Sequence, residues 1–223
     1  MTELLDIPGV VETLLHRPLI DVLPDVAAPP PWRLTCEAMV WVARGGRADA
    51  LGSAHEPGRG TFVVGGFVRY LDTPVGPYCE VFGALAKLTP TTLALTVPFL
   101  AVDSPQSLVA GRRNWALPKT SARFCGTPLT GRAAASGTGW QVHADARPCG
   151  RFLPTPLPMF ARLDQPGPDG CARRSALRGR GKVRLAVLDV SVCSDGPLAS
   201  WLRPGRHLGC VVRDARLHLA GPS

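Results

Sequence analysis

The chain has 223 residues, of which 45% are hydrophobic and 19% are charged, and its formal net charge at pH 7 is +8. This length suits one large domain or two small ones and allows a sizeable core. The basic excess would fit an anionic partner such as nucleic acid. However, the arginines are mostly scattered and no nucleic-acid recognition motif accompanies them, so we expect no nucleic-acid partner.

The seven cysteines are an odd number, and their spacing gives neither a zinc-binding nor a thioredoxin-type motif. The five histidines are also widely spaced, so we expect no metal site. Asp6, Pro8 and Glu12 interrupt the apolar residues near the N-terminus, which leaves no signal-peptide core. No apolar run approaches the roughly 20 residues of a membrane helix. We therefore expect a reduced, cytoplasmic protein without a membrane partner.

The first 31 residues are expected to form an arm that packs on the rest of the chain. Residues 9–16 have the pattern of a short amphipathic helix, and a proline-rich approach ends in three consecutive prolines at 29–31. Residues 32–223 are expected to form a single domain.

The domain begins with segments that have the composition of strands. These are residues 34–44, 61–71, 78–88 and 91–102, and the Pro/Gly turn at 72–77 predicts a hairpin between the second and third. The pair Gly65-Gly66 indicates a bulge or a close approach to the backbone, and Pro98 indicates an edge, a bulge or a strand end.

A short helix is predicted next. Ser104 offers an N-cap, Pro105 a first-turn residue and Gly111 a stop, which gives about two turns. Later strand-like segments are 121–125, 139–146, 152–163, 182–192 and 207–219, and residues 200–202 predict a second short helix. The basic cluster at 173–184 is expected to cover a solvated loop and a strand start. Helices do not alternate with strands and no GxGxxG motif occurs, so we predict a mainly β fold.

Lys119 stands out because lysine occurs only at positions 87, 119 and 182. The residues before it, Trp115 to Pro118, form an apolar and conformationally restricted lead-in. A lysine side chain ordinarily has a pKa of ~10.4, so it is a poor nucleophile at pH 7 unless its surroundings, such as burial, lower that pKa. A neutral amine can form a Schiff base with a ketone or aldehyde. A lysine after a turn proline is more often a solvated surface residue, so both interpretations stay open.

Glu80 is the second candidate. Its strand-like segment places Tyr78 and Phe82 on the same face as the carboxylate and Val81 on the other, so its neighbours are apolar on both sides. A carboxylate in such surroundings either pairs with a cation or rises in pKa, and both situations are typical of functional sites. Pairing with a structural arginine is an equally good interpretation.

These two stretches resemble the acetoacetate decarboxylase family. The family motif Gly-Arg-Glu-x-x-Gly-aromatic-Pro-Lys-Lys-Leu-Ala is similar to GRRNWALPKTSA at 111–122, and its first lysine, which forms the Schiff base, corresponds to Lys119. An upstream Tyr-x-Glu strand of the family corresponds to residues 78–80, and its glutamate lines the catalytic pocket. The resemblance covers about residues 30 to 215.

Several charged positions of the family differ here. The second lysine is replaced by Thr120, and Arg113 stands where the motif has glutamate. If Glu37 matches a family glutamate, Cys36 takes the place of a pocket arginine, and a further family glutamate falls on Gly65. These changes weaken the expectation of a β-keto acid substrate more than they weaken that of a reactive lysine.

The resemblance implies a mainly β fold, a curved sheet forming a cone or barrel with a few short helices. It implies Lys119 as Schiff-base nucleophile and Glu80 as general acid or base. The candidate substrate-binding residues are Tyr78, Arg113, Trp115 and Leu117, and Phe99 is a further candidate for a pocket wall.

The implied function is that of a Schiff-base lyase acting on a small keto acid or carbonyl compound. No cofactor or metal is needed, because the iminium is the electron sink. A homo-oligomer is expected on the resemblance alone. Two alternatives stay open: aldolase or dehydratase chemistry on the same lysine, and a non-catalytic small-molecule-binding protein in which Lys119 pairs with Glu80.

Overall fold

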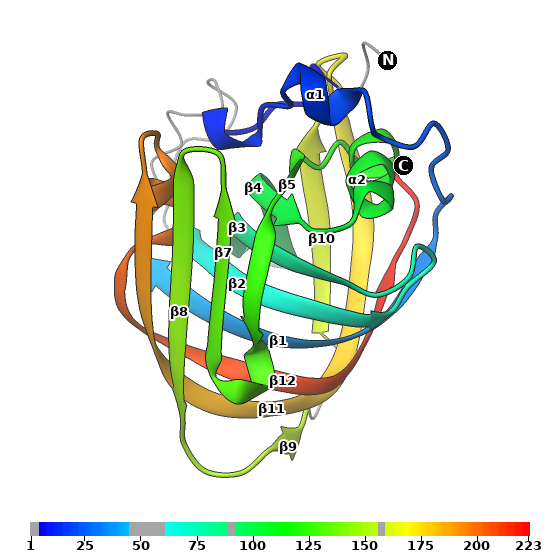
Figure 1. Cartoon of the computed structure of the whole chain (residues 1–223). Helices are drawn as coiled ribbons and strands as arrows, with labels where there is room; N and C mark the ends of the chain where they lie inside the picture. The colour runs from blue at the N-terminus through cyan, green and yellow to red at the C-terminus, as the bar shows by residue number, and fades with distance from the viewer. Residues whose placement is uncertain (1–4, 45–60, 89–91, 156–158) are drawn as a thin grey trace.

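The computed structural model describes residues 5–44, 61–88, 92–155 and 159–223 (Figure 1). Within these residues, twelve strands pair into one strongly curved sheet, and the helices are few and short. The predicted mainly β fold is therefore confirmed.

The first four long strands follow one another in the sheet as antiparallel neighbours. They are β1 (Trp32–Arg44), β2 (Thr61–Asp72), β3 (Tyr78–Leu88) and β4 (Leu93–Val102). The hairpin of β2 and β3 is confirmed, with Tyr70 directly opposite Tyr78. The β3–β4 register shifts between Gly83 and Leu85, opposite Pro98, so this proline lies at a bulge.

The rest of the sheet comes from the second half of the chain. Its strands are β5 (Lys119–Ser121), β6 (Arg123–Thr127), β7 (Arg132–Gly137), β8 (Trp140–Pro148), β9 (Leu153–Pro154), β10 (Met159–Pro166), β11 (Ala172–Ser194) and β12 (Gly205–Leu219). The helices are η2 (Val11–Thr13), α1 (Arg17–Ile20), α2 (Pro105–Trp115), η4 (Pro128–Thr130) and α3 (Leu198–Leu202).

The long strand β11 connects two parts of the sheet. Its first part pairs with β10, and because β10 also pairs with β4, the path β10-β4-β3-β2-β1-β12-β11 returns to its start. Its second part pairs with β8, which continues the sheet to β7 and β6. In Figure 1 the strands β8, β7 and β6 cross in front of the curved strands β1, β2 and β3.

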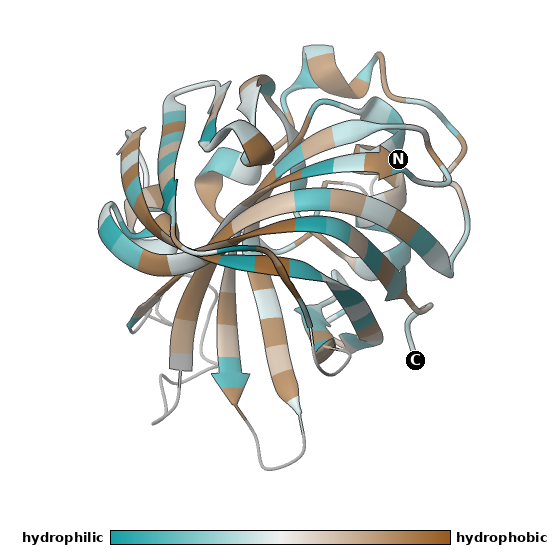
Figure 2. Cartoon of the chain, turned by 90° about the horizontal axis from the view of Figure 1, so that it is seen from below, coloured by the Kyte–Doolittle hydropathy of each residue, from teal (hydrophilic) through white to brown (hydrophobic). Residues whose placement is uncertain are grey.

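The strands β1 to β4 separate two apolar cores. Consecutive residues of β4 show this arrangement, because Phe99 and Ala101 belong to one core while Leu100 and Val102 belong to the other. We call the first the hairpin core, since β7 and β8 pack into it together with α3. We call the second the α2 core, since it contains the apolar face of α2. Figure 2 shows the hydrophobic and hydrophilic bands along the curved strands.

The structure differs from the expected elements at three places. Within the helix expected at 9–16 only the short 3-10 helix η2 forms, and α1 begins after it at Arg17, with Pro18 in its first turn. The basic cluster at 173–184 lies within β11, not in a loop; Arg174, Arg178 and Arg180 are exposed, whereas Arg173 and Arg184 are partly buried. The strand β7 was not predicted. Within the described residues, no helix is long and apolar enough to cross a membrane.

The helix α2 is longer than predicted. It continues through Gly111 to Trp115, and Ala116 ends it in a left-handed conformation with φ 53°. Gly111 therefore does not end the helix. The Lys119 side chain packs against this position instead.

Candidate active site

Lys119 is delivered into the α2 core by the segment that follows α2. Arg112 and Gly111 accept the hydrogen bonds that close the helix, and Lys119 then begins β5, paired in parallel with Leu100 of β4. The residue is only 3% exposed. Of the two interpretations that the sequence left open, the structure therefore has the interior position and not the solvated one.

Gly111 makes room for the lysine side chain. A Cβ atom at this position would lie 2.5 Å from Cδ and 2.6 Å from Cε of Lys119, closer than real Cβ contacts. The aliphatic part of Lys119 thus crosses α2 directly over this glycine, and no larger residue fits beneath it without displacing the lysine.

The amine of Lys119 contacts three side chains. Its Nζ donates to Oε2 of Glu80 at 3.1 Å and to Oγ of Ser107 at 2.9 Å. It also lies 5.2 Å from the centre of the Tyr78 ring. The amine therefore has one carboxylate, one hydroxyl and one aromatic face around it in the interior of the protein.

Glu80 lies on β3, on the face that looks into the α2 core, and it is 6% exposed. Its second oxygen, Oε1, accepts a hydrogen bond from the hydroxyl of Tyr70 at 3.2 Å. The Tyr70 ring packs 4.5 Å from that of Tyr78, its partner across the hairpin. Both oxygens of the carboxylate are thus engaged, one by a phenol and one by the amine.

The site keeps its other ionisable groups neutral. Burial, reinforced by the Glu80 carboxylate, raises the pKa of Tyr70 and of Tyr78 well above the usual value. Burial also raises the pKa of the Cys36 thiol to about 12, with Glu80 as the second cause. Near neutral pH these three residues are a pair of phenols and a thiol.

Arg112 holds the backbone that carries the lysine. Its Nε donates to the Lys119 carbonyl at 2.7 Å and its Nη2 donates to the Thr13 carbonyl at 2.6 Å. Burial lowers the pKa of this guanidinium to about 10, which leaves it charged at neutral pH. The N-terminal segment and β5 are thus joined through one buried cation.

The structure brings together some of the predicted site residues and not others. Lys119, Glu80 and Tyr78 meet, and Leu117 is buried in the same core. Trp115 packs edge-on against Trp32 in this core, 5.1 Å between ring centres.

Two further predicted residues point elsewhere. The Arg113 guanidinium donates to the Asp25 carbonyl, so it is directed toward the N-terminal segment. Phe99, considered as a pocket wall, belongs to the hairpin core and packs on Trp140.

Two polar residues of the site were missed from the sequence. Ser107 follows the N-cap Ser104 by three residues and so lies in the first turn of α2, where its hydroxyl reaches the amine. Tyr70 lies opposite Tyr78 across the hairpin, whereas the predicted turn at 72–77 would place Leu71 there, so the sequence came within one residue of this contact. No signal in the sequence indicated the contact of Ser107.

Besides Arg113, three charged positions of the family differ in this chain, and these three lie in different places. Cys36 is in the α2 core, close enough for Glu80 to raise its pKa. Thr120 pairs with Ala101, which faces the hairpin core, and Gly65 lies against the Trp41 ring of that core. Only Cys36 therefore shares the face of the sheet that carries Lys119 and Glu80.

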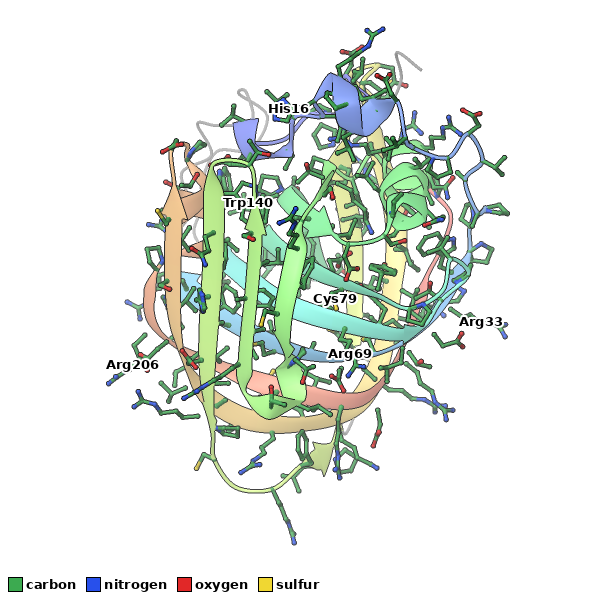
Figure 3. The ribbon with its side chains drawn as sticks, in the orientation of Figure 1. His16, Arg33, Arg69, Cys79, Trp140 and Arg206 are labelled. Carbon is green, nitrogen blue, oxygen red and sulfur yellow. The ribbon has the colours of Figure 1, made fainter. Side chains whose placement is uncertain are left out.

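A hollow of about 670 Å³ lies on the other side of β5, between the N-terminal segment and β6 to β8. Thr120 and Ser121 line it, together with His16 and Trp140, both labelled in Figure 3. Within the described residues, no group of three or more His, Cys, Asp or Glu side chains could hold a metal ion.

Solved structures resemble this chain over most of its length. The acetoacetate decarboxylase of Legionella pneumophila matches with a TM-score of 0.50 and 14% identity, over 92% of this chain and 94% of that one. The chain has an acetoacetate decarboxylase-like fold. The enduracididine biosynthesis enzyme MppR, complexed with pyruvate, matches with a TM-score of 0.59 and 15% identity, over 87% and 90% of the two chains.

A third structure, an acetoacetate decarboxylase-like enzyme from Sphingomonas wittichii RW1, matches with a TM-score of 0.52 and 13% identity, over 88% and 93%. Comparisons with protein-family models and with curated proteins found no match. At these identities the likeness establishes the fold of the chain.

Proposed function

We propose that the protein is a Schiff-base-forming lyase that acts on a small carbonyl compound through Lys119. The observation that carries this proposal is the buried contact of the Lys119 amine with the Glu80 carboxylate and the Ser107 hydroxyl. The fold supports it, because the structural neighbours are enzymes of the acetoacetate decarboxylase type.

The groups around the amine suit imine formation. Proton transfer from the lysine to Glu80 leaves a neutral amine, which attacks the carbonyl carbon of the substrate. The carbinolamine then loses water, and Glu80 returns the proton that the leaving hydroxyl needs. The resulting iminium draws electrons from the bond at the neighbouring carbon, which allows cleavage or deprotonation there. Ser107 and the two tyrosines hold the amine and the carboxylate in place for both steps.

Aldolase or dehydratase chemistry is the second candidate. One solved structure of MppR contains the condensation product of pyruvate and imidazole 4-carboxaldehyde. Carbonyl condensation on the same lysine would use the same contacts in this chain.

A non-catalytic binding protein is the third candidate, because Lys119 and Glu80 also form a complete buried ion pair, with their side chains 4% and 8% exposed. Reductive trapping separates this candidate from the enzymes. The full-length protein is incubated with small keto acids, aldehydes and ketones, reduced with borohydride, and digested for mass spectrometry. We expect a mass shift on the Lys119 peptide that Lys119→Arg abolishes and that Lys182→Arg, a change at an exposed lysine, leaves intact. A Lys119 peptide without adducts across the whole panel would refute the Schiff base.

A further inference from the structure

The charges around the Lys119 amine balance without a substrate. The amine and Glu80 form one ion pair, and among the described residues the hydrogen-bonding and ring partners of the pair are the hydroxyls of Ser107 and Tyr70 and the ring of Tyr78. Binding a substrate carboxylate beside this pair would be unfavourable, because a buried charge needs its own counter-charge or several hydrogen-bond donors.

The nearby cations that the structure describes bind other groups or point away from the amine. Arg112 donates to two backbone carbonyls, those of Lys119 and Thr13. Arg69 alternates with Tyr70 on β2, so it points to the opposite face of the sheet, where its Nη1 lies 3.5 Å from Oε1 of Glu37. Arg33 projects from the outside of the molecule (Figure 3).

Three side chains within the site are subject to the same two electrostatic effects. In Cys36, Tyr70 and Tyr78 the neutral form is favoured, first by burial and then by the Glu80 carboxylate. Each of these groups would become an anion on losing its proton, and each is held back from doing so. The same two causes act on any other anion placed among them.

We propose that the substrate of Lys119 is an uncharged aldehyde or ketone, without a carboxylate beside its carbonyl group. This inference rests on the proposed Schiff-base function and narrows its substrate class. It follows from the contacts above, in which Glu80 already occupies the position of the single anion that the amine can neutralise.

The chemistry of an uncharged substrate preserves this balance. Ammonium, carboxylate and carbonyl compound give iminium, carboxylate and water, so one cation faces one anion before and after the step. Glu80 then takes a proton from the carbon next to the iminium, and the electron pair of that C–H bond forms the enamine. Without a carboxylate no carbon dioxide can leave. The remaining lyase reactions are dehydration and cleavage of a carbon–carbon bond of the aldol type.

Size-matched pairs of carbonyl compounds test the inference in the full-length protein. Glyoxylate is compared with glycolaldehyde, and pyruvate with hydroxyacetone, by borohydride trapping and peptide mass spectrometry. The exposed Lys182 of the same molecule is the internal reference for intrinsic reactivity. We expect the ratio of neutral to anionic adducts on Lys119 to exceed that on Lys182 by at least tenfold. Glu80→Gln removes the buried carboxylate, so in this variant we expect the ratio of neutral to anionic adducts on Lys119 to approach the ratio on Lys182.

The outcomes are distinct. A Lys119 ratio equal to that of Lys182, or one that favours the keto acids, overturns the uncharged substrate and leaves the Schiff base standing. No adduct on Lys119 with any of the four compounds overturns the Schiff-base function and this inference with it. The comparison within the native protein decides the matter even if Glu80→Gln does not fold.

Discussion

At the scale of single residues, the ion pair of Lys119 and Glu80 is not expected to stabilise the fold more than apolar residues would. A buried ion pair loses hydration on both sides, and hydrophobic residues of similar volume often serve as well or better. Removing one partner is different, because the other charge stays buried without its counter-charge. The interior position of this pair therefore fits the proposed chemistry better than a role in folding stability.

This explanation gives a stability prediction. Lys119→Met strands the Glu80 carboxylate and should lower the free energy of unfolding by about 3–5 kcal/mol at neutral pH. Adding Glu80→Gln removes the stranded charge and leaves an amide oxygen that accepts from Tyr70, so the double variant should regain at least half of the loss. Urea unfolding of the native protein and the two variants measures this. A double variant no more stable than Lys119→Met would show that the pair itself supports the fold.

At the scale of elements, the contact between α2 and β5 fixes the direction of the lysine. Gly111→Ala would stabilise an ordinary helix by about 0.5–1 kcal/mol, because glycine loses more backbone freedom on folding. Here the added methyl meets the Lys119 side chain, so we expect destabilisation of about 1–3 kcal/mol instead. The amine should also leave Glu80, and borohydride trapping on Lys119 should fall at least tenfold.

Gln106→Ala is the matched control for this prediction, because Gln106 is an exposed residue of the same helix. It should leave trapping unchanged. A Gly111→Ala protein that is as stable as the native one and as readily trapped would show that the lysine does not depend on this crossing.

The strands could be predicted from the sequence, whereas the contact between α2 and β5 could not. The strands β1 to β4 follow from local composition, since runs such as 61–71 are apolar on both faces and end at Pro/Gly turns. Gly111 suggested a helix stop because local rules assign glycine to that role. Its real function depends on a residue eight positions later, and only the packing of β5 against α2 reveals it. Ser107 was missed for the same reason.

At the scale of the whole molecule, the sheet separates the site from a second core. Lys119 and Glu80 face the α2 core, while Trp41 lies in the hairpin core and its Nε1 donates to the Leu202 carbonyl of α3 at 2.8 Å. The resemblance to the decarboxylases drew attention to Gly65 and Thr120, but both belong to the hairpin side. Sequence spacing alone could not assign them to a face, because bulges in β2, β4 and β12 change the alternation.

The separation of the two cores can be tested at Gly65. A methyl group there would lie 2.4 Å from the Trp41 ring, which the bond to Leu202 holds in place. Gly65→Ala should therefore lower the free energy of unfolding by about 1–3 kcal/mol through overpacking. Because the strain falls on the far side of the sheet, the rate of borohydride trapping on Lys119, measured well below the Tm, should stay within twofold of the native rate. A large loss of trapping in a folded Gly65→Ala protein would mean that the hairpin core positions the amine through the sheet.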